Sequence, residues 1–321
     1  MSLKKIKVSV IGVGNMGKNH VRTYIEMEDI NLVAIADVNE DLGKNVSETF
    51  GVKLYEDYKE MIDIEKPDVV SICVPTIFHY DVAYYCIKNG INVLLEKPIC
   101  LNISEAIKLR TLAKKKKVKF LVGHIERFNP AVKKVKEMIV KRELGDIIAI
   151  IARRVGGFPP QIKDANIVID LAIHDVDIVN YLLDENPNEI LVNKQKNHIL
   201  RREDSVELFL KYKKTSAYVQ ANWVTPVKIR KLNITGTEGY LEMDYISQSI
   251  EFYKSNYNKF TQQYGSYSDY ILEFSEPDKM IINVARKEPL KEEIRYFINC
   301  VLSNIDIDIK FAIDALKIVS S

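Results

Sequence analysis

The stretch Ile11-Gly12-Val13-Gly14-Asn15-Met16-Gly17 decides the fold of the first part of the chain. It follows a compact run of β-branched residues, Ile6–Ile11, and it opens a segment with helical spacing, Asn15–Glu28. The first glycine permits a tight turn, the second lets backbone approach a pyrophosphate, and the third lets the helix pack on the strand. The helix N-terminus then faces the phosphates. The stretch therefore predicts a dinucleotide site, with a purely structural glycine turn as the alternative. We expect the cofactor to contact Gly12, Gly14, Asn15, Met16 and Gly17.

A carboxylate at the end of the second predicted strand indicates which dinucleotide binds. Asp37 follows the apolar run Leu32–Ala36. A carboxylate at this place accepts hydrogen bonds from the ribose hydroxyls and repels a 2′-phosphate. The next three residues, Val38–Glu40, supply no cation to offset that repulsion. The sequence therefore favours NAD over NADP.

Strand and helix signals alternate over the first 123 residues. Apolar runs such as Asp68–Val74 and Asn92–Glu96 are separated by segments with helical spacing, such as His79–Lys88 and Ser104–Lys117. Alternation at this pace implies a parallel sheet with helices on both faces. We predict an α/β fold that begins with a doubly wound Rossmann domain over residues 1–123.

The rhythm changes near Gly123. A long predicted helix near Val168–Leu183 is followed by strands in succession, among them Ser205–Tyr212 and Ser216–Trp223. Consecutive strands favour a largely antiparallel sheet with helices on one face, so the other face is wet or covered by a partner. We predict a second, α+β domain over residues 124–321 with an open-faced sheet.

Composition excludes several classes of function. The 321 residues carry 46 basic and 44 acidic side chains, a net charge of +2 that calls for neither nucleic acid nor an anionic membrane. No stretch approaches the roughly 20 apolar residues of a membrane span, and no signal peptide is evident. The four cysteines form no Cys-x-x-Cys pair, which argues against a zinc site or a disulfide framework. We expect a cytoplasmic protein without a bound metal.

Two predicted strands end in polar residues at the edge where open α/β sheets bind ligands. One leads into Val74-Pro75-Thr76-Ile77-Phe78-His79 and the other into Glu96-Lys97-Pro98. Pro98 restricts the backbone of Lys97 to an extended form. An ammonium beside the cofactor can assist proton transfer. The alternative is an exposed lysine paired with Glu96.

A second polar pair lies on the long helix predicted near Val168–Leu183. Asp170 and His174 are four residues apart and so share one helix face, which Asp177 and Tyr181 continue. A carboxylate beside a histidine fixes its tautomer and raises its basicity, which suits a general acid or base. The alternatives are a satisfied polar network at a domain junction and a metal pair, for which no third ligand is evident.

The chain resembles the glucose–fructose oxidoreductase/inositol dehydrogenase/MocA family over essentially its whole length. The resemblance implies a Rossmann domain, a C-terminal open-faced sheet often used in dimer or tetramer contacts, and NAD(P)-dependent oxidation or reduction of a sugar-like hydroxyl. The motifs that carry it are, in order, Gly12–Gly17, Pro75 with His79, Glu96-Lys97-Pro98, Gly123 through Arg127-Phe128-Asn129-Pro130, and Asp170 with His174.

The resemblance also implies roles for individual residues. Lys97 and His174 become the proton-handling pair, with Asp170 as their partner. The segments Arg153–Pro160 and Trp223–Gly239 look similar to members that act on nucleotide sugars, such as UDP-N-acetylglucosamine 3-dehydrogenases. The residues expected along the nicotinamide are Pro75, Thr76, His79, Glu96 and Lys97. Those expected to touch substrate are Arg127, Asn129, Arg153 and Trp223.

The sequence thus predicts an NAD-dependent oxidoreductase for a sugar, sugar derivative or nucleotide sugar, working as a homodimer or homotetramer through the C-terminal sheet. Three alternatives stay open: a dinucleotide-binding regulatory protein, a Rossmann reductase with a non-sugar substrate, and a glycosidase that uses NAD without net redox change. The last predicted helix ends at Ser321, sooner than in many relatives, so the resemblance implies an incomplete C-terminus.

Overall fold

The computed structural model describes residues 5–158, 166–198, 202–255 and 278–320, which form two compact units. The first unit runs from the N-terminus to Ile125 and takes in Leu290–Lys317. The second comprises Glu126–Pro289 with the last residues of the chain. The division at residue 123 that the sequence suggests stays a prediction. No helix in these ranges is both long and apolar enough to cross a membrane.

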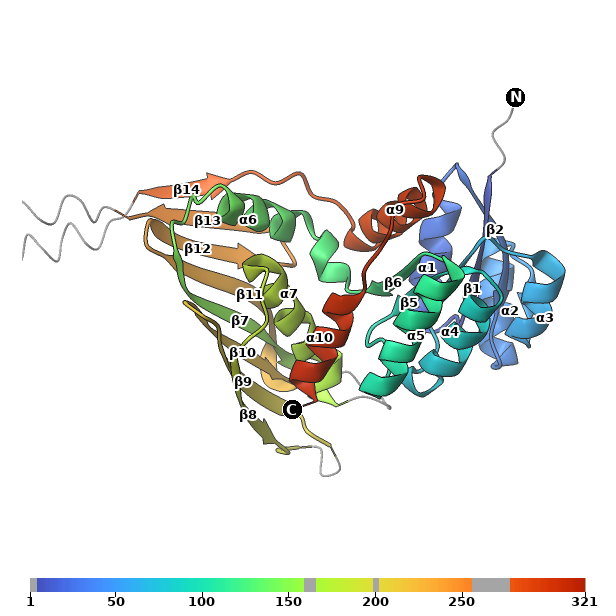
Figure 1. The fold of residues 1–321 in the computed structure, drawn as a ribbon, viewed down its shortest axis with the longest axis horizontal. Coiled ribbons are helices and arrows are strands. Elements are labelled where there is room, and N and C mark those ends of the chain that lie inside the picture. Colours follow the sequence, from blue (N-terminus) through green and yellow to red (C-terminus); the bar gives the residue numbers. More distant parts are fainter. Residues whose placement is uncertain (1–4, 159–165, 199–201, 256–277, 321) are drawn as a thin grey trace, which may run out of the picture. The chain divides into compact units, whose positions relative to one another are not determined.

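The described part of the first unit contains a six-stranded parallel sheet, in the order β3-β2-β1-β4-β5-β6 (Figure 1). The chain order reverses between β1 and β4, and in open α/β sheets ligands bind at such a switch point, beyond the carboxyl ends of the strands. The strands are β1 (Ile6–Ile11), β2 (Ile30–Ala36), β3 (Leu54–Tyr55), β4 (Val69–Ile72), β5 (Asn92–Glu96) and β6 (Phe120–Gly123).

Helices cover this sheet, and their starts follow from side-chain caps. Asn39, Asp57 and Asn102 each accept a hydrogen bond from a backbone N–H in the first turn that follows. Two helices from the end of the chain, α9 and α10, belong to the same unit. The helices are α1 (Asn15–Ile25), α2 (Glu40–Phe50), α3 (Tyr58–Glu65), α4 (His79–Lys88), α5 (Ile103–Lys116), α9 (Pro289–Leu302) and α10 (Lys310–Val319).

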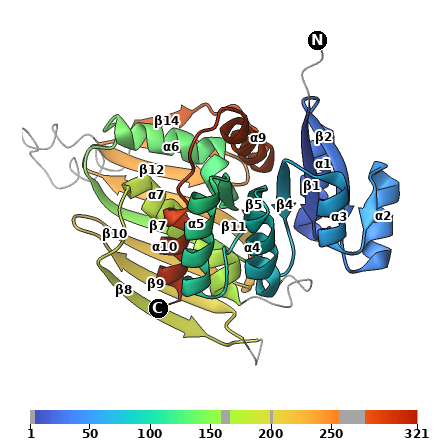
Figure 2. The same cartoon turned by 45° about the vertical axis from the view of Figure 1, so that its right-hand side comes forward.

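The described part of the second unit holds an eight-stranded sheet in the order β14-β13-β12-β11-β7-β10-β9-β8, with α6 and α7 on one face (Figures 1 and 2). Among the described strands of this sheet, only the β7–β10 pair is parallel. The elements are α6 (Pro130–Val140), β7 (Ile147–Gly157), α7 (Ile173–Leu183), β8 (Glu189–Gln195), β9 (Ser205–Lys211), β10 (Ser216–Asn222), β11 (Val224–Gly236), β12 (Gly239–Asp244), β13 (Ser249–Lys254) and β14 (Lys279–Ile282).

Side-chain alternation on this second sheet separates a covered face from an open one. On β10, Ala217, Val219 and Ala221 are buried, whereas Tyr218 between them is exposed. Tyr218 lies in register with exposed residues on its neighbours, so a row of apolar side chains crosses four strands of one face. The row is Leu191, Phe209, Tyr218 and Ile151. The predicted fold class, a Rossmann sheet plus an open-faced, largely antiparallel sheet, is confirmed.

Candidate active site

The glycine loop between β1 and α1 is built so that its middle stays open. A Cβ on Gly12, whose φ is +83°, would lie 2.8 Å from the backbone of Cys73 and Val74. A Cβ on Gly17 would lie 2.0 Å from the Gly12 carbonyl oxygen, so these two glycines are needed for the loop to close. A Cβ on Gly14, by contrast, would meet nothing within 4 Å. That open backbone at a helix N-terminus fits a pyrophosphate.

Substitutions at Gly14 and Gly17 are therefore expected to act differently. Gly17→Ala should lower the free energy of unfolding by about 3 kcal/mol, because its methyl group meets backbone that cannot give way. Gly14→Ala should leave thermal stability unchanged but raise the Kd for NAD at least about tenfold, since the methyl group occupies ligand space. Thermal unfolding and calorimetric titration with NAD check both. Unchanged NAD affinity in Gly14→Ala would contradict the assignment of the loop.

Asp37, at the carboxyl end of β2, holds the glycine loop in place. Its Oδ2 accepts a hydrogen bond from the Val13 N–H at 2.7 Å, and its Oδ1 accepts one from the Asn39 N–H at 2.8 Å. A carboxylate oxygen has a second lone pair, so these bonds leave acceptor capacity for a ribose. The carboxylate thus lies beside the loop, as a nicotinamide dinucleotide requires.

The residues after β4 and β5 come together through His79. Pro75 precedes a 3₁₀ turn, Thr76–Phe78, and His79 then begins α4. The buried His79 ring joins the two loops, because its Nδ1 lies 2.7 Å from the Pro98 carbonyl oxygen and its Nε2 lies 2.9 Å from that of Val74. His79 therefore links the backbone that follows β4 to the backbone that follows β5, next to Lys97.

Glu96 is held by a buried histidine of α1 that the sequence motifs do not single out. His20 Nε2 lies 2.9 Å from Glu96 Oε1, and His20 Nδ1 lies 3.1 Å from Ser71 Oγ. The Ser71 hydroxyl is in turn hydrogen-bonded to the Tyr24 hydroxyl at 2.6 Å. Burial alone would raise the pKa of the Glu96 carboxyl, but the hydrogen bond and charge of His20, with the nearby Lys97, lower it. The carboxylate beside Lys97 is thus ionised and engaged by His20.

Asp170 and His174 lie in the second unit, at a break in the helix that carries them. Residues Val168–Ala172 form a π-helical turn, and the α-helix predicted over this stretch begins only at Ile173. The Ile173 N–H donates to the Val168 carbonyl, five residues back. Such turns occur frequently at functional sites. Both side chains are half-buried.

Two arginines anchor α7 by binding carboxylates that this helix carries. Arg154 binds both oxygens of Asp175, at 2.9 and 3.0 Å, and Glu126 at 2.9 Å. Arg127 binds both oxygens of Asp177, at 2.7 and 2.8 Å. These pairs fix the helix next to His174.

The four predicted substrate contacts have different surroundings. Arg127 is engaged by Asp177 and lies over the Tyr181 ring. Asn129 caps α6 and donates to the Tyr245 carbonyl. Arg153 donates to Gln220 on the exposed side of the sheet. Trp223 is buried against Phe158, the last described residue before 159–165; Pro159 and Pro160 lie outside the described residues.

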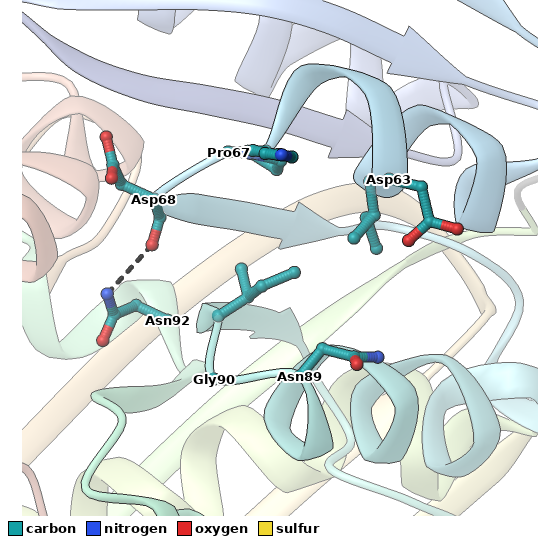
Figure 3. Close-up of a pocket in the computed structure, with 9 residues that line it drawn as sticks. Asp63, Pro67, Asp68, Asn89, Gly90 and Asn92 are labelled. Atoms are coloured by element: carbon teal, nitrogen blue, oxygen red, sulfur yellow. Dashed lines mark hydrogen bonds between the residues drawn. The ribbon is translucent and has the colours of Figure 1, made fainter.

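A cavity of about 390 Å³ lies at the opposite edge of the Rossmann sheet, where β4 and β5 begin. Asp63, Pro67 and Asn89 line it, and the Asn92 amide closes one side by donating to the Asp68 carbonyl at 2.9 Å (Figure 3). Because ligands of open α/β sheets gather at the carboxyl ends of the strands, we do not place the active site here.

The fold and the loop define a nicotinamide-dinucleotide-binding protein of the Rossmann class with a second, open-faced sheet domain. Residues 6–124 match the model of the GFO/IDH/MocA oxidoreductase family with NAD-binding Rossmann fold, and residues 132–242 match the GFO/IDH/MocA C-terminal domain. The chain belongs to this family, as the sequence predicts.

Individual relatives include enzymes for cyclitols and nucleotide sugars. Myo-inositol 2-dehydrogenase of Thermotoga maritima is 30% identical over 195 residues, which are 59% of this chain and 58% of that protein. UDP-N-acetylglucosamine 3-dehydrogenase of Acidithiobacillus ferrooxidans is 22% identical over 93% of this chain and 90% of its own length. The solved structure of the latter superposes with a TM-score of 0.85, covering 99% of this chain and 96% of that one at 21% identity. At this identity the structural likeness establishes the fold.

Proposed function

We propose that the protein is an NAD-dependent dehydrogenase that acts on a secondary hydroxyl of a sugar, a sugar derivative or a nucleotide sugar. The observation that carries this proposal is the open Gly14 backbone beside Asp37, at the same sheet edge as Lys97. The bound nicotinamide supplies the hydride acceptor. The choice of NAD rather than NADP is supported by the Asp37 carboxylate, which would repel a 2′-phosphate.

The protein's own residues handle the hydroxyl proton in this proposal. Either His174 or Lys97 takes the proton, Asp170 holds His174, and the Lys97 ammonium stabilises the developing alkoxide. Glu96, ionised and fixed by His20, supports the charge on Lys97. In this proposal Pro75, Thr76 and His79 lie along the nicotinamide end of the cofactor.

For the substrate we propose a UDP-N-acetylhexosamine oxidised in a 3-dehydrogenase type of reaction. This proposal is supported by the name of the Acidithiobacillus ferrooxidans relative, which aligns over 93% of this chain. Arg127, Asn129, Arg153 and Trp223 remain the predicted substrate contacts. We further propose a cytoplasmic homodimer or homotetramer that covers the apolar row on the open sheet.

A substrate panel tests the function. The purified protein is incubated with NAD or NADP and with myo-inositol, glucose, glucose 6-phosphate, UDP-glucose or UDP-N-acetylglucosamine, and the absorbance of the reduced cofactor is followed. We expect reduction of NAD, with UDP-N-acetylglucosamine as the best substrate. UMP serves as the control, since it offers a nucleotide without the sugar. Cofactor reduction with none of the sugars would overturn the proposal and favour a regulatory or non-redox role.

A further inference from the structure

Glu293, on α9, is a buried carboxyl group that the proposed reaction does not use. Its side chain is fully buried, and neither oxygen has a hydrogen-bonding partner among the described residues. Two cations of the same helix have other partners: Lys291 binds Glu26, and Arg295 binds Asp29. A buried carboxyl left in this state needs a proton or another positive partner.

The titratable groups of the described residues that interact with Glu293 are a phenol, a thiol and a carboxyl. Tyr24 of α1, Cys73 after β4 and Glu96 at the end of β5 all interact with it electrostatically. The imidazole of His20 is already engaged by Glu96 and Ser71. Glu96 is the carboxyl that ionises, because the His20 imidazole and the Lys97 ammonium lower its pKa. Glu293 and Glu96 interact electrostatically in a buried site, which disfavours charge on both at once.

One member of this cluster, Cys73, packs against the predicted cofactor loop. The Cβ position of Gly17 is 3.5 Å from the Cys73 Cβ, and that of Gly12 abuts the Cys73 backbone. The cluster also joins three elements, α1, β4 and β5, whose ends lead to the loop and to Lys97. A change of charge in this cluster would therefore affect the elements that lead to the glycine loop and to Lys97.

We propose that Glu293 holds a proton in the folded protein and that, as a neutral acid beside the ionised Glu96, it is a positioning residue for Glu96 and for the Lys97 that follows. A neutral carboxyl leaves the charge of a neighbouring carboxylate in place, whereas an ionised one repels it. Burial, followed by the charge of Glu96, holds the pKa of Glu293 well above its usual value. The part that concerns Lys97 rests on the proposed function.

A metal ion is the competing occupant, and the test must separate it from a proton. Ligand atoms of His20, Cys73 and Glu96 lie within 4.8 Å of one another, a donor set that zinc accepts. Metal analysis of the purified protein, before and after dialysis against zinc sulphate, is expected to find less than stoichiometric zinc. A stoichiometric, chelator-resistant ion would overturn the proposal.

The pH dependence of stability tests the proton on Glu293. With a raised pKa in the folded state, Glu293 binds more protons folded than unfolded, so its contribution to stability falls as pH rises above about 4.5. The isosteric Glu293→Gln does not titrate. We expect its melting temperature, relative to the unmodified protein, to climb steadily from pH 5 to pH 8. Glu48→Gln, at an exposed site on α2, is the control and should show no such trend. A difference that is constant with pH would overturn the proposal.

Chemical labelling of Lys97 tests the positioning role without any substrate. The rate at which an amine-reactive reagent modifies Lys97 is measured by mass spectrometry as a function of pH. Glu293→Leu should shift this profile to lower pH by about one unit, because an apolar side chain then replaces the polar neighbour of Glu96, and Glu96 supports the ammonium less. Glu293→Gln, which keeps a neutral polar side chain of the same shape, should restore the original profile. Identical profiles in all three proteins would overturn the positioning role and leave the dehydrogenase proposal intact.

Discussion

Lys97→Met and His174→Ala are each expected to lower kcat on the identified sugar by about 10²- to 10⁴-fold, while the Kd for NAD changes little. The expected size is that of losing a general acid or base from a hydroxyl oxidation. NAD binding should survive, because the glycine loop and Asp37 hold the dinucleotide independently of either side chain. Steady-state kinetics and calorimetric titration with NAD measure the two effects separately.

Two control substitutions match the charge and size of the ones tested. Lys88→Met removes an exposed lysine at the end of α4, and His198→Ala removes an exposed histidine in the second unit. Both should retain normal kcat. If Lys97→Met and His174→Ala also turn over at nearly the normal rate, the assignment of the proton-handling pair is wrong.

Chemical rescue then identifies the base. Added imidazole should restore activity to His174→Ala if the histidine takes the hydroxyl proton, because the added base occupies the vacated space. Added methylamine should do the same for the shorter Lys97→Ala if the lysine is the base. If only one of the two variants regains activity, the residue replaced in that variant is the base.

Local patterns were sufficient to predict the glycine turn between β1 and α1 and the fold class. The roles of Gly12 and Gly17 follow from spacing between a strand and a helix, and the structure gives them a steric cause. Asp37 could be placed at a strand end because an apolar run stops directly before it. These features depend on residues close together in the chain, which is why a sequence reveals them.

The buried partners could not be predicted, because they come from distant parts of the chain. His20 meets Glu96 across 76 residues, and Glu293 reaches the same cluster from a helix near the C-terminus. The one signal for His20 was its place on an apolar helix face, which also fits a core residue. The π turn at Val168–Ala172 was equally hidden, since one extra residue in a turn leaves the apolar pattern almost unchanged.

Arginine pairing shows the same limit in the second unit. The family resemblance makes Arg127 a predicted substrate contact, and the fold adds a bidentate pair with Asp177 that the sequence does not reveal. Asp177 was assigned to the polar stripe of the long helix, and its partner lies 50 residues earlier. Spacing indicated that the stripe needs partners, whereas only the fold identifies them.

Arg154→Met is expected to be the most destabilising of the substitutions considered, lowering the free energy of unfolding of the second unit by about 3–5 kcal/mol. Arg154 and Asp175 are both buried, and removal of the guanidinium leaves Asp175 and Glu126 without their counter-charge in a low dielectric. The opposing charges of these two carboxylates outweigh burial and hold the pKa of Arg154 above its usual value. The arginine is therefore charged at every pH at which the protein is folded.

Urea unfolding followed by tryptophan fluorescence measures this loss in the second unit, because Trp223 is the only tryptophan of the chain and is buried there, between β10 and β11. Arg153→Met is the matched control: it is the preceding residue of β7, its side chain is exposed, and its loss should change stability by less than about 0.5 kcal/mol. Combining Arg154→Met with Asp175→Leu should recover part of the lost stability, because the buried Asp175 charge is then removed as well. The remaining unpaired carboxylate is Glu126, which is nearer to solvent. Equal stabilities of Arg154→Met and Arg153→Met would mean that the ion pairs do not anchor α7, and the position of His174 would then have to be set by apolar packing alone.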